Sequence, residues 1–237
     1  MGRGARIYKA QDGASKDASR SMRGLPMFVS SWRQAAKMFS VHANRIVSGQ
    51  FRTDTPKRYE IMTNDYLISV RKQFEYYKML GDRTLSQLQD DKLFWKYNDD
   101  SNSIATIVKH LWGNMLSRWT DFLTSDGEKE FRNRDAEFEN DLRNREELLD
   151  KWNEGWSCLF NAINTLTADD LDKTIYIRNQ GHTVTEAINR QLAHYPYHIG
   201  QIVFLGKMLA ENGWTSLSIP KGNSQSHNKD MFSKPKQ

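Results

Sequence analysis

Apolar residues recur at helical spacing in four stretches of the chain. The first runs from Asn64 to about Gln89, and the second follows Ser103, a good N-cap residue, and extends to about Thr124. The third runs from about Arg145 to Leu166, and the fourth begins with Thr185 as its cap and ends at Asn212-Gly213, a helix stop signal. This pattern predicts an all-α protein, an antiparallel four-helix bundle with a long connection between helices two and three.

The segments between these helices carry weaker signals. Thr174 to Arg178 alternates apolar and polar residues, and the following Asn179 to Thr183 has the composition of a tight turn back, so we expect a small β-hairpin insertion before helix four. The segment from Glu128 to Asn144 is dense in charge and predicts a long loop or short helical turns with a solvated surface. Thr167 is expected to begin a helical turn.

Composition and charge separate the first quarter of the chain from the rest. Residues 1–61 hold twelve Lys or Arg against four Asp or Glu, whereas the remaining residues hold 22 against 25. The main body is thus mildly acidic, which argues against nucleic-acid binding. No apolar run approaches the roughly 18 residues of a membrane span, and a single cysteine, Cys158, excludes an internal disulfide. We therefore expect a protein that binds neither membrane nor nucleic acid.

The basic segment 1–61 permits several interpretations. Its low hydrophobicity and excess charge favour a disordered extension, while its Arg and Ser content would also suit a targeting peptide or a basic tail for anionic surfaces. A further interpretation, and the one we favour, is that the segment is non-native, either an added leader or translation upstream of the true start. Because Thr63-Asn64-Asp65 provides N-cap chemistry after Met62, we expect a folded domain over residues 62–220 and a polar tail over 221–237.

The fourth predicted helix contains His194-Tyr-Pro-Tyr-His198. Two histidines four residues apart lie on one face of a helix, where both imidazoles can reach one metal ion. Pro196 between them removes a backbone hydrogen bond, which costs about 3 kcal/mol in a helix interior. The alternative is a pair of partly buried core histidines.

A third histidine lies on the second predicted helix. A polar stripe beside its apolar face consists of His110, Asn114, Ser117 and Asp121, and a similar stripe on helix four consists of Gln191, His194, His198 and Gln201. If the two stripes meet, His110, His194 and His198 supply three nitrogen ligands and leave a position open, as in catalytic metal sites. Asn114 and Gln201 become candidates for orienting imidazoles or substrate.

The other candidate ligands fit this pattern less well. His42 lies in the basic extension, His182 in the hairpin turn and His227 in the tail, so we interpret them as surface or turn residues. Cys158 on helix three is expected to be a small core residue rather than a thiolate ligand.

Two segments carry a family resemblance. "IVKHLWGNMLSRW", which contains His110, and "AINRQLAHYPYHIGQIVFLGKML", which contains His194 and His198, resemble the DinB/YfiT-like metalloenzyme superfamily, over about residues 62–220. The resemblance implies that these three histidines bind a divalent metal, zinc or nickel. It also implies a four-helix bundle, a homodimer and a bacterial cytoplasmic location. Some relatives are S-transferases that join a low-molecular-weight thiol such as bacillithiol to an electrophile.

Three functions therefore stay open. The first is a metal-dependent transferase that holds a small-molecule thiol as a thiolate and lets it attack an electrophile. In such an enzyme Arg118, Arg134 and Arg190 could bind carboxylates of the thiol, but the sequence does not show which of them points inward. The second is a hydrolase that uses metal-bound hydroxide, for which no carboxylate is placed as general base. The third is a stress-related binding or interaction module with a structural or vestigial metal.

Overall fold

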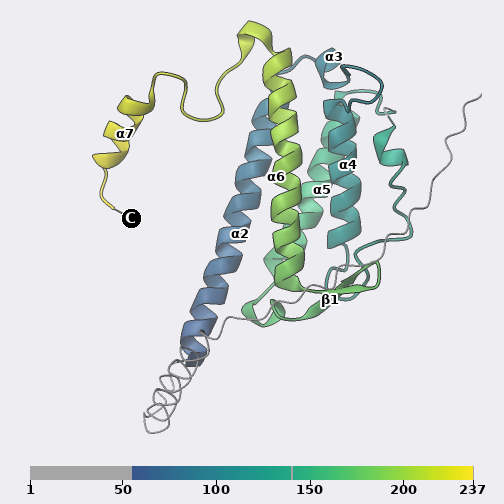
Figure 1. Cartoon of the computed structure of the whole chain (residues 1–237), viewed down its shortest axis with the longest axis vertical. Helices are drawn as coiled ribbons and strands as arrows, with labels where there is room; N and C mark the ends of the chain where they lie inside the picture. The colour runs from purple at the N-terminus through teal and green to yellow at the C-terminus, as the bar shows by residue number, and fades with distance from the viewer. Residues whose placement is uncertain (1–54, 140, 237) are drawn as a thin grey trace, which may run out of the picture. The chain divides into compact units, whose positions relative to one another are not determined.

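Four long helices dominate the structure (Figure 1). The computed structural model describes residues 55–139 and 141–236. The long helices are α2 (Thr55–Leu85), α4 (Ile104–Trp119), α5 (Arg145–Thr165) and α6 (Val184–Leu209). The shorter elements are α3 (Asp90–Leu93), α7 (Ser224–Phe232), the 3₁₀ turns η1 (Ala136–Phe138), η2 (Ala168–Asp170) and η3 (Glu211–Gly213), and the strands β1 (Thr174–Ile177) and β2 (Gln180–Thr183). The protein is mostly helical with one small antiparallel hairpin, as the sequence predicts.

Capping side chains account for most helix starts. Ser103 caps α4 as predicted, because its side chain accepts a hydrogen bond from the Thr106 N–H, and Asn144 caps α5 in the same way. The cap of α6 is Thr183 rather than the predicted Thr185. Thr183 forms a capping box with Glu186. The box satisfies two backbone N–H groups, which makes it more stabilising than a cap that satisfies one.

Two helix ends differ from the prediction. Helix α4 ends at Trp119 instead of about Thr124, because Asp121 adopts a φ of 46°, which no α-helix accommodates. Helix α2 begins at Thr55 rather than Asn64 and so runs through Met62; Pro56 is compatible with a first turn, whose N–H groups have no intrahelical partner. The rest of the predicted basic extension, residues 1–54, lies outside the described residues.

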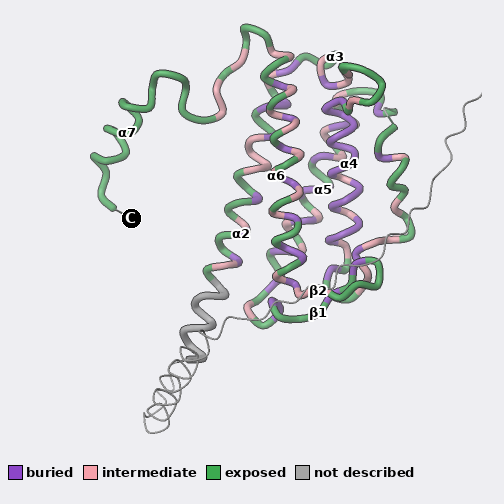
Figure 2. Tube along the Cα trace, viewed as in Figure 1, coloured by how far each residue is buried: buried purple, intermediate pink, exposed green. Residues whose placement is uncertain are grey.

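The long helices pack in pairs around one apolar core. Helix α2 contacts α5 and α6, and α4 contacts α5 and α6. Buried positions face inward on all four helices (Figure 2). The largest fully buried side chains include Trp156, Tyr195, Phe74 and Met115. Two glycines on α2 and α6 permit close approach, because an added Cβ at Gly81 would overlap the Trp152 ring and one at Gly206 would overlap Thr84.

The hairpin closes one end of the helices. Strands β1 and β2 pair antiparallel, with Ile177 opposite Gln180, and Ile175 and Ile177 point into the core. The two turn residues, Arg178 and Asn179, have φ of 55° and 60°. This conformation suits a two-residue hairpin turn but is unfavourable for a side chain such as arginine.

Two connections and the tail complete the chain. The segment after α4 forms a loop with the short turn η1, as predicted, and η2 begins after Thr167 with a capping box. The polar tail expected after residue 220 contains the helix α7, all of whose residues are exposed. No helix in the described residues is long and apolar enough to cross a membrane.

The buried hydroxyl of Tyr195 provides a test of the core. It donates to Asn114 Oδ1 at 3.1 Å and accepts from Trp119 Nε1 at 2.9 Å, and burial raises the pKa of this phenol. We expect Tyr195→Phe to lower the free energy of unfolding by about 1–3 kcal/mol, because both partners lose their bond in a buried site. Urea denaturation measures this change. Tyr197→Phe, at a neighbouring exposed tyrosine, is the control; equal effects of the two substitutions would contradict the assignment.

Candidate metal centre

Three histidines from two helices meet at one point. His110 lies on α4, and His194 and His198 lie one turn apart on α6. Nε2 of His194 is 3.4 Å from Nε2 of His110 and 3.0 Å from Nε2 of His198. One nitrogen from each ring lies within 4.8 Å of the other two, and no other group of at least three potential ligands in the described part of the chain comes together this way. The sequence prediction that these rings converge is confirmed.

Each imidazole is held from behind by an oxygen. Nδ1 of His110 lies 2.9 Å from Glu137 Oε2, Nδ1 of His194 lies 3.3 Å from Gln191 Oε1, and Nδ1 of His198 lies 2.8 Å from Gln201 Oε1. Carboxylate and amide oxygens only accept hydrogen bonds, so each Nδ1 carries the proton and donates it. The three Nε2 atoms therefore present lone pairs.

Facing lone pairs repel one another, and a cation between them would remove that repulsion. Three acceptors at these separations cannot hydrogen-bond to one another, whereas a metal ion at about 2.0–2.1 Å from each nitrogen satisfies all three. Tetrahedral coordination at that bond length places two nitrogens about 3.3 Å apart, close to the separations observed. The residues present thus fit a divalent metal, although imidazole ligands alone do not decide between zinc and nickel.

Protonation is disfavoured at two of the three rings. Burial, with the neighbouring His198 and His110, lowers the pKa of His194 to about 3. Burial also lowers the pKa of His198, although its bond to Gln201 acts in the opposite direction. At neutral pH both rings are therefore neutral, which is the form that binds a metal.

A buried carboxylate supports His110. Glu137, in η1, has only 3% of its surface exposed, and Arg132 grips it with two bonds, Nε to Oε1 at 2.7 Å and a terminal nitrogen to Oε2 at 3.0 Å. Burial alone would raise the pKa of Glu137, but the bonds from His110 and Arg132 lower it, so the carboxylate stays ionised. Phe138 stacks on the His110 ring, with centroids 5.2 Å apart.

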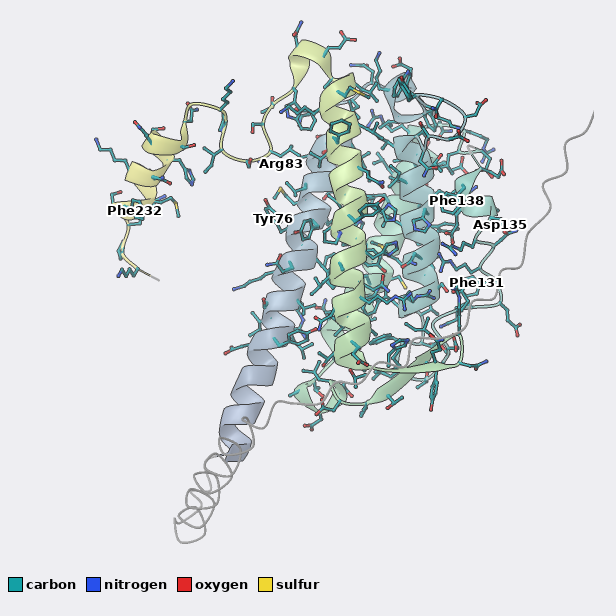
Figure 3. The ribbon with its side chains drawn as sticks, viewed as in Figure 1. Tyr76, Arg83, Phe131, Asp135, Phe138 and Phe232 are labelled. Atoms are coloured by element: carbon teal, nitrogen blue, oxygen red, sulfur yellow. The ribbon has the colours of Figure 1, made fainter. Side chains whose placement is uncertain are left out.

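This segment corrects one sequence interpretation. The charged run from Glu128 to Asn144 was expected to be a solvated surface, and its exposed members Phe131 and Asp135 fit that view (Figure 3). Glu137, however, is turned inward and completes the site. Its approach to α4 depends on Gly113, because a Cβ there would overlap Glu137 Oε1 and lie 2.8 Å from Cδ. In the sequence, the only sign that a side chain packs close to α4 here is the glycine three residues after His110.

The two polar candidates have different roles. Gln201 contacts His198 directly, as described above. Asn114 is buried and lines the same pocket as the histidines, but its Oδ1 is bound by Tyr195 rather than by an imidazole. Gln191, which holds His194, belongs to the polar stripe predicted for helix four but was not chosen there as an orienting residue.

A pocket of about 390 Å³ opens beside the histidines. It is lined by Asn114, Gln191, Phe138 and Tyr197, and by five arginines: Arg118, Arg132, Arg134, Arg178 and Arg190. The three arginines that the sequence left undecided thus all reach the pocket. Arg132 and Arg178 were missed, because a loop and a turn have no periodicity that reveals where a side chain points.

The remaining histidines and the cysteine lie elsewhere. His182 is in β2 and His227 is exposed in α7, while His42 lies outside the described residues. Cys158 is half-buried and its pKa is raised mainly by burial, which agrees with a packing role.

Comparison with known proteins gives a family. Residues 61–223 match a family model described as "Protein of unknown function (DUF1572)". The chain belongs to this family. The match covers all three histidines and every element from α3 to β2, together with α6. No curated protein and no solved structure matches the chain.

Gly113→Ala tests the support of His110. The added methyl must displace the buried Glu137 carboxylate from its bonds to His110 and Arg132, so we expect a metal affinity lowered about 10- to 100-fold and a free energy of unfolding lowered by about 1–3 kcal/mol. Chelator competition measures the affinity. Gly200→Ala is the control, because a Cβ there meets nothing within 4 Å. Unchanged affinity in Gly113→Ala would contradict the role given to Glu137.

Proposed function

We propose that the protein binds a divalent metal through His110, His194 and His198 and transfers a low-molecular-weight thiol to an electrophilic substrate. The observation that supports the proposal best is the orientation of the three rings, each with Nδ1 occupied by an oxygen and Nε2 turned to a common point. The pocket beside them gives room for two small reactants.

The chain's own residues orient the reaction. The imidazoles are fixed from behind by Glu137, Gln191 and Gln201, which leaves one side of the centre open to the pocket. A metal held there supplies charge that lowers the pKa of a thiol and keeps it as a thiolate. The thiol sulfur forms a bond to the electrophilic carbon while the leaving group departs with its electron pair, and the thiol proton passes to solvent.

Further features of the proposal come from the resemblance to the DinB/YfiT-like superfamily. We place the helices α2, α4, α5 and α6 in a four-helix bundle of that type, which agrees with their pairwise packing. A homodimer and a cytoplasmic location belong to the same proposal.

Two alternatives compete with the transferase. A hydrolase would need a free carboxylate near Nε2, but the residues that line the pocket include none, and Glu137 is engaged by Arg132 and by Nδ1 of His110. A non-catalytic binding module with a structural or vestigial metal would use the same three ligands without turnover, so activity separates it from the transferase.

Metal content tests the ligands. We expect purified wild-type protein to hold about one divalent ion per chain and His198→Ala to lose most of it, because two imidazoles bind more weakly than three. Elemental analysis gives the content and identifies zinc or nickel. His227→Ala, at an exposed histidine of α7, is the control. Equal metal in wild type and His198→Ala would overturn the assignment.

Turnover tests the reaction. We expect the metal-loaded protein to consume bacillithiol, mycothiol or glutathione in the presence of a chlorodinitrobenzene-type electrophile, with activity lost after chelation and restored by added metal. Absorbance of the thioether product measures the rate. Intact metal binding without metal-dependent turnover would leave the non-catalytic module as the better interpretation.

A further inference from the structure

The pocket beside the three histidines carries an excess of positive charge. Five arginines line it, and only two carboxylates, Glu128 and Glu137, pair with any of them in the described part of the chain. The arginines therefore exceed these carboxylates by three charges before any metal is added. Like charges gathered in a partly enclosed site repel one another and favour a bound anion.

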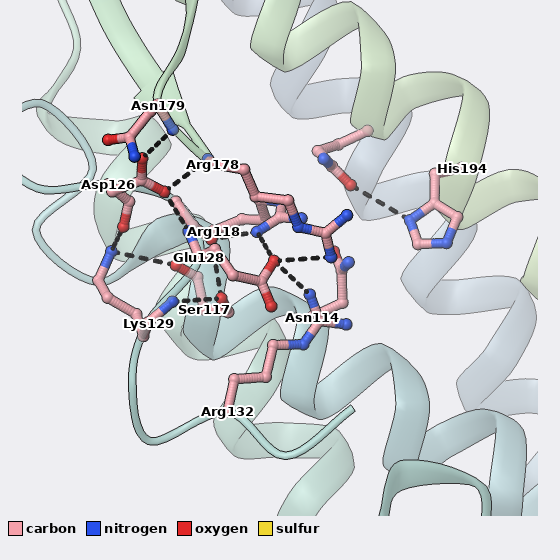
Figure 4. A network of polar contacts seen from close by, with 12 residues as sticks. Asn114, Ser117, Arg118, Asp126, Glu128, Lys129, Arg132, Arg178, Asn179 and His194 are labelled. Atoms are coloured by element: carbon pink, nitrogen blue, oxygen red, sulfur yellow. Dashed lines mark hydrogen bonds and ion pairs between the residues drawn. The ribbon is translucent and has the colours of Figure 1, made fainter. Parts of the chain in front are cut away.

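One carboxylate oxygen serves three of these arginines. Oε2 of Glu128 lies 3.1 Å from Arg118, 3.5 Å from Arg132 and 3.1 Å from Arg178 (Figure 4). Arg132 also grips Glu137, so its charge is already shared between two carboxylates. Glu128 thus orders one wall of the pocket but does not neutralise it.

Arg178 reaches this wall from a costly backbone conformation. Its φ of 55° is uncommon for arginine, and Asp126 stabilises it by accepting the N–H groups of Arg178 and Asn179, each at 2.8 Å. The Gly127 N–H also donates to Tyr176 O, which ties the loop to β1. The loop that carries Glu128 is therefore fastened to the hairpin turn that carries Arg178, and the two side chains meet at the pocket.

The other arginines have unused donors. Arg118 is 7% exposed, and its terminal nitrogen binds Gly127 O and Glu128, but its Nε is buried without a partner. Arg134 and Arg190 are exposed, and within the residues that the structure describes their guanidinium groups make no ion pair or side-chain hydrogen bond. Two free guanidinium groups on one pocket suit an acceptor that the protein itself does not supply.

We propose that this pocket binds an oxyanion group, carboxylate or phosphate, of a small-molecule ligand, with Arg134 and Arg190 as its principal contacts. The ligand class is a multiply charged anion, because the excess charge exceeds one. The role as a substrate subsite rests on the proposed function, in which such a group would direct the reactive end of the ligand towards the histidines. The anion binding itself does not require a metal.

The test uses the full chain stripped of metal with chelator, and two probes, inorganic phosphate and glutarate. Calorimetry measures their affinities for wild type, for Arg134→Gln/Arg190→Gln and for Arg143→Gln, a matched control at an exposed arginine outside the pocket. We expect at least one probe to bind wild type and to bind the double variant at least about tenfold more weakly, with the control unchanged. The probe that binds more tightly shows whether a carboxylate or a phosphate is preferred.

The opposing results are equally defined. No binding of either probe to wild type, or a loss of less than about tenfold in the double variant, would overturn the anion site. Because the protein is free of metal in this experiment, that outcome is distinct from a failure of metal binding or of thiol transfer. Conversely, if a probe binds but the purified chain takes up no divalent metal in the elemental analysis, the anion site is supported and the proposed reaction is not.

Discussion

The functional arrangement depends on the proton carried by Nδ1 of each of three imidazoles. Glu137, Gln191 and Gln201 each offer an oxygen to Nδ1, so the lone pairs of Nε2 are directed to one point. The oxygens come from both the 3₁₀ turn η1 and α6, while the rings come from α4 and α6. Packing between α4 and α6 and docking of the charged loop against α4 must therefore both be correct for the centre to exist.

The polar half of the site is buried at a cost that its own bonds offset. A lone ionised Glu137 at 3% exposure would be strongly unfavourable, but the two-pronged bond from Arg132 and the bond from His110 satisfy both oxygens. In the adjoining pocket the charges are not balanced in this way, because arginines outnumber carboxylates. The network around Glu137 is therefore fully paired and supports the histidines, whereas the arginine pocket has unpaired charge available to a ligand.

The sequence alone predicts the parts of the site that lie on regular helices. His194 and His198 are four residues apart on one helix face, and His110 lies beside the apolar stripe of another helix, so helical geometry predicts which side chains could meet. That the two stripes do meet was implied by the family resemblance and is seen in the packing of α4 against α6. Glu137 and Arg132 were missed because they lie in a loop, where charge density is compatible with solvent exposure as well as burial. Only the tertiary contact at Gly113 decides between the two. The sequence prediction placed the α6 cap at Thr185 instead of Thr183 because it left out the reciprocal hydrogen bond between Glu186 and Thr183.

The distribution of the ligands along the chain sets the order in which the centre can form. His110 is separated by 84 residues from His194, and the latter lies on the last helix of the packed core. During synthesis, a ribosome must release nearly the whole domain before the third imidazole is present. Until α6 is made, His110 has its carboxylate neighbour but no second imidazole. The complete three-histidine centre can therefore bind an ion only once α6 has docked.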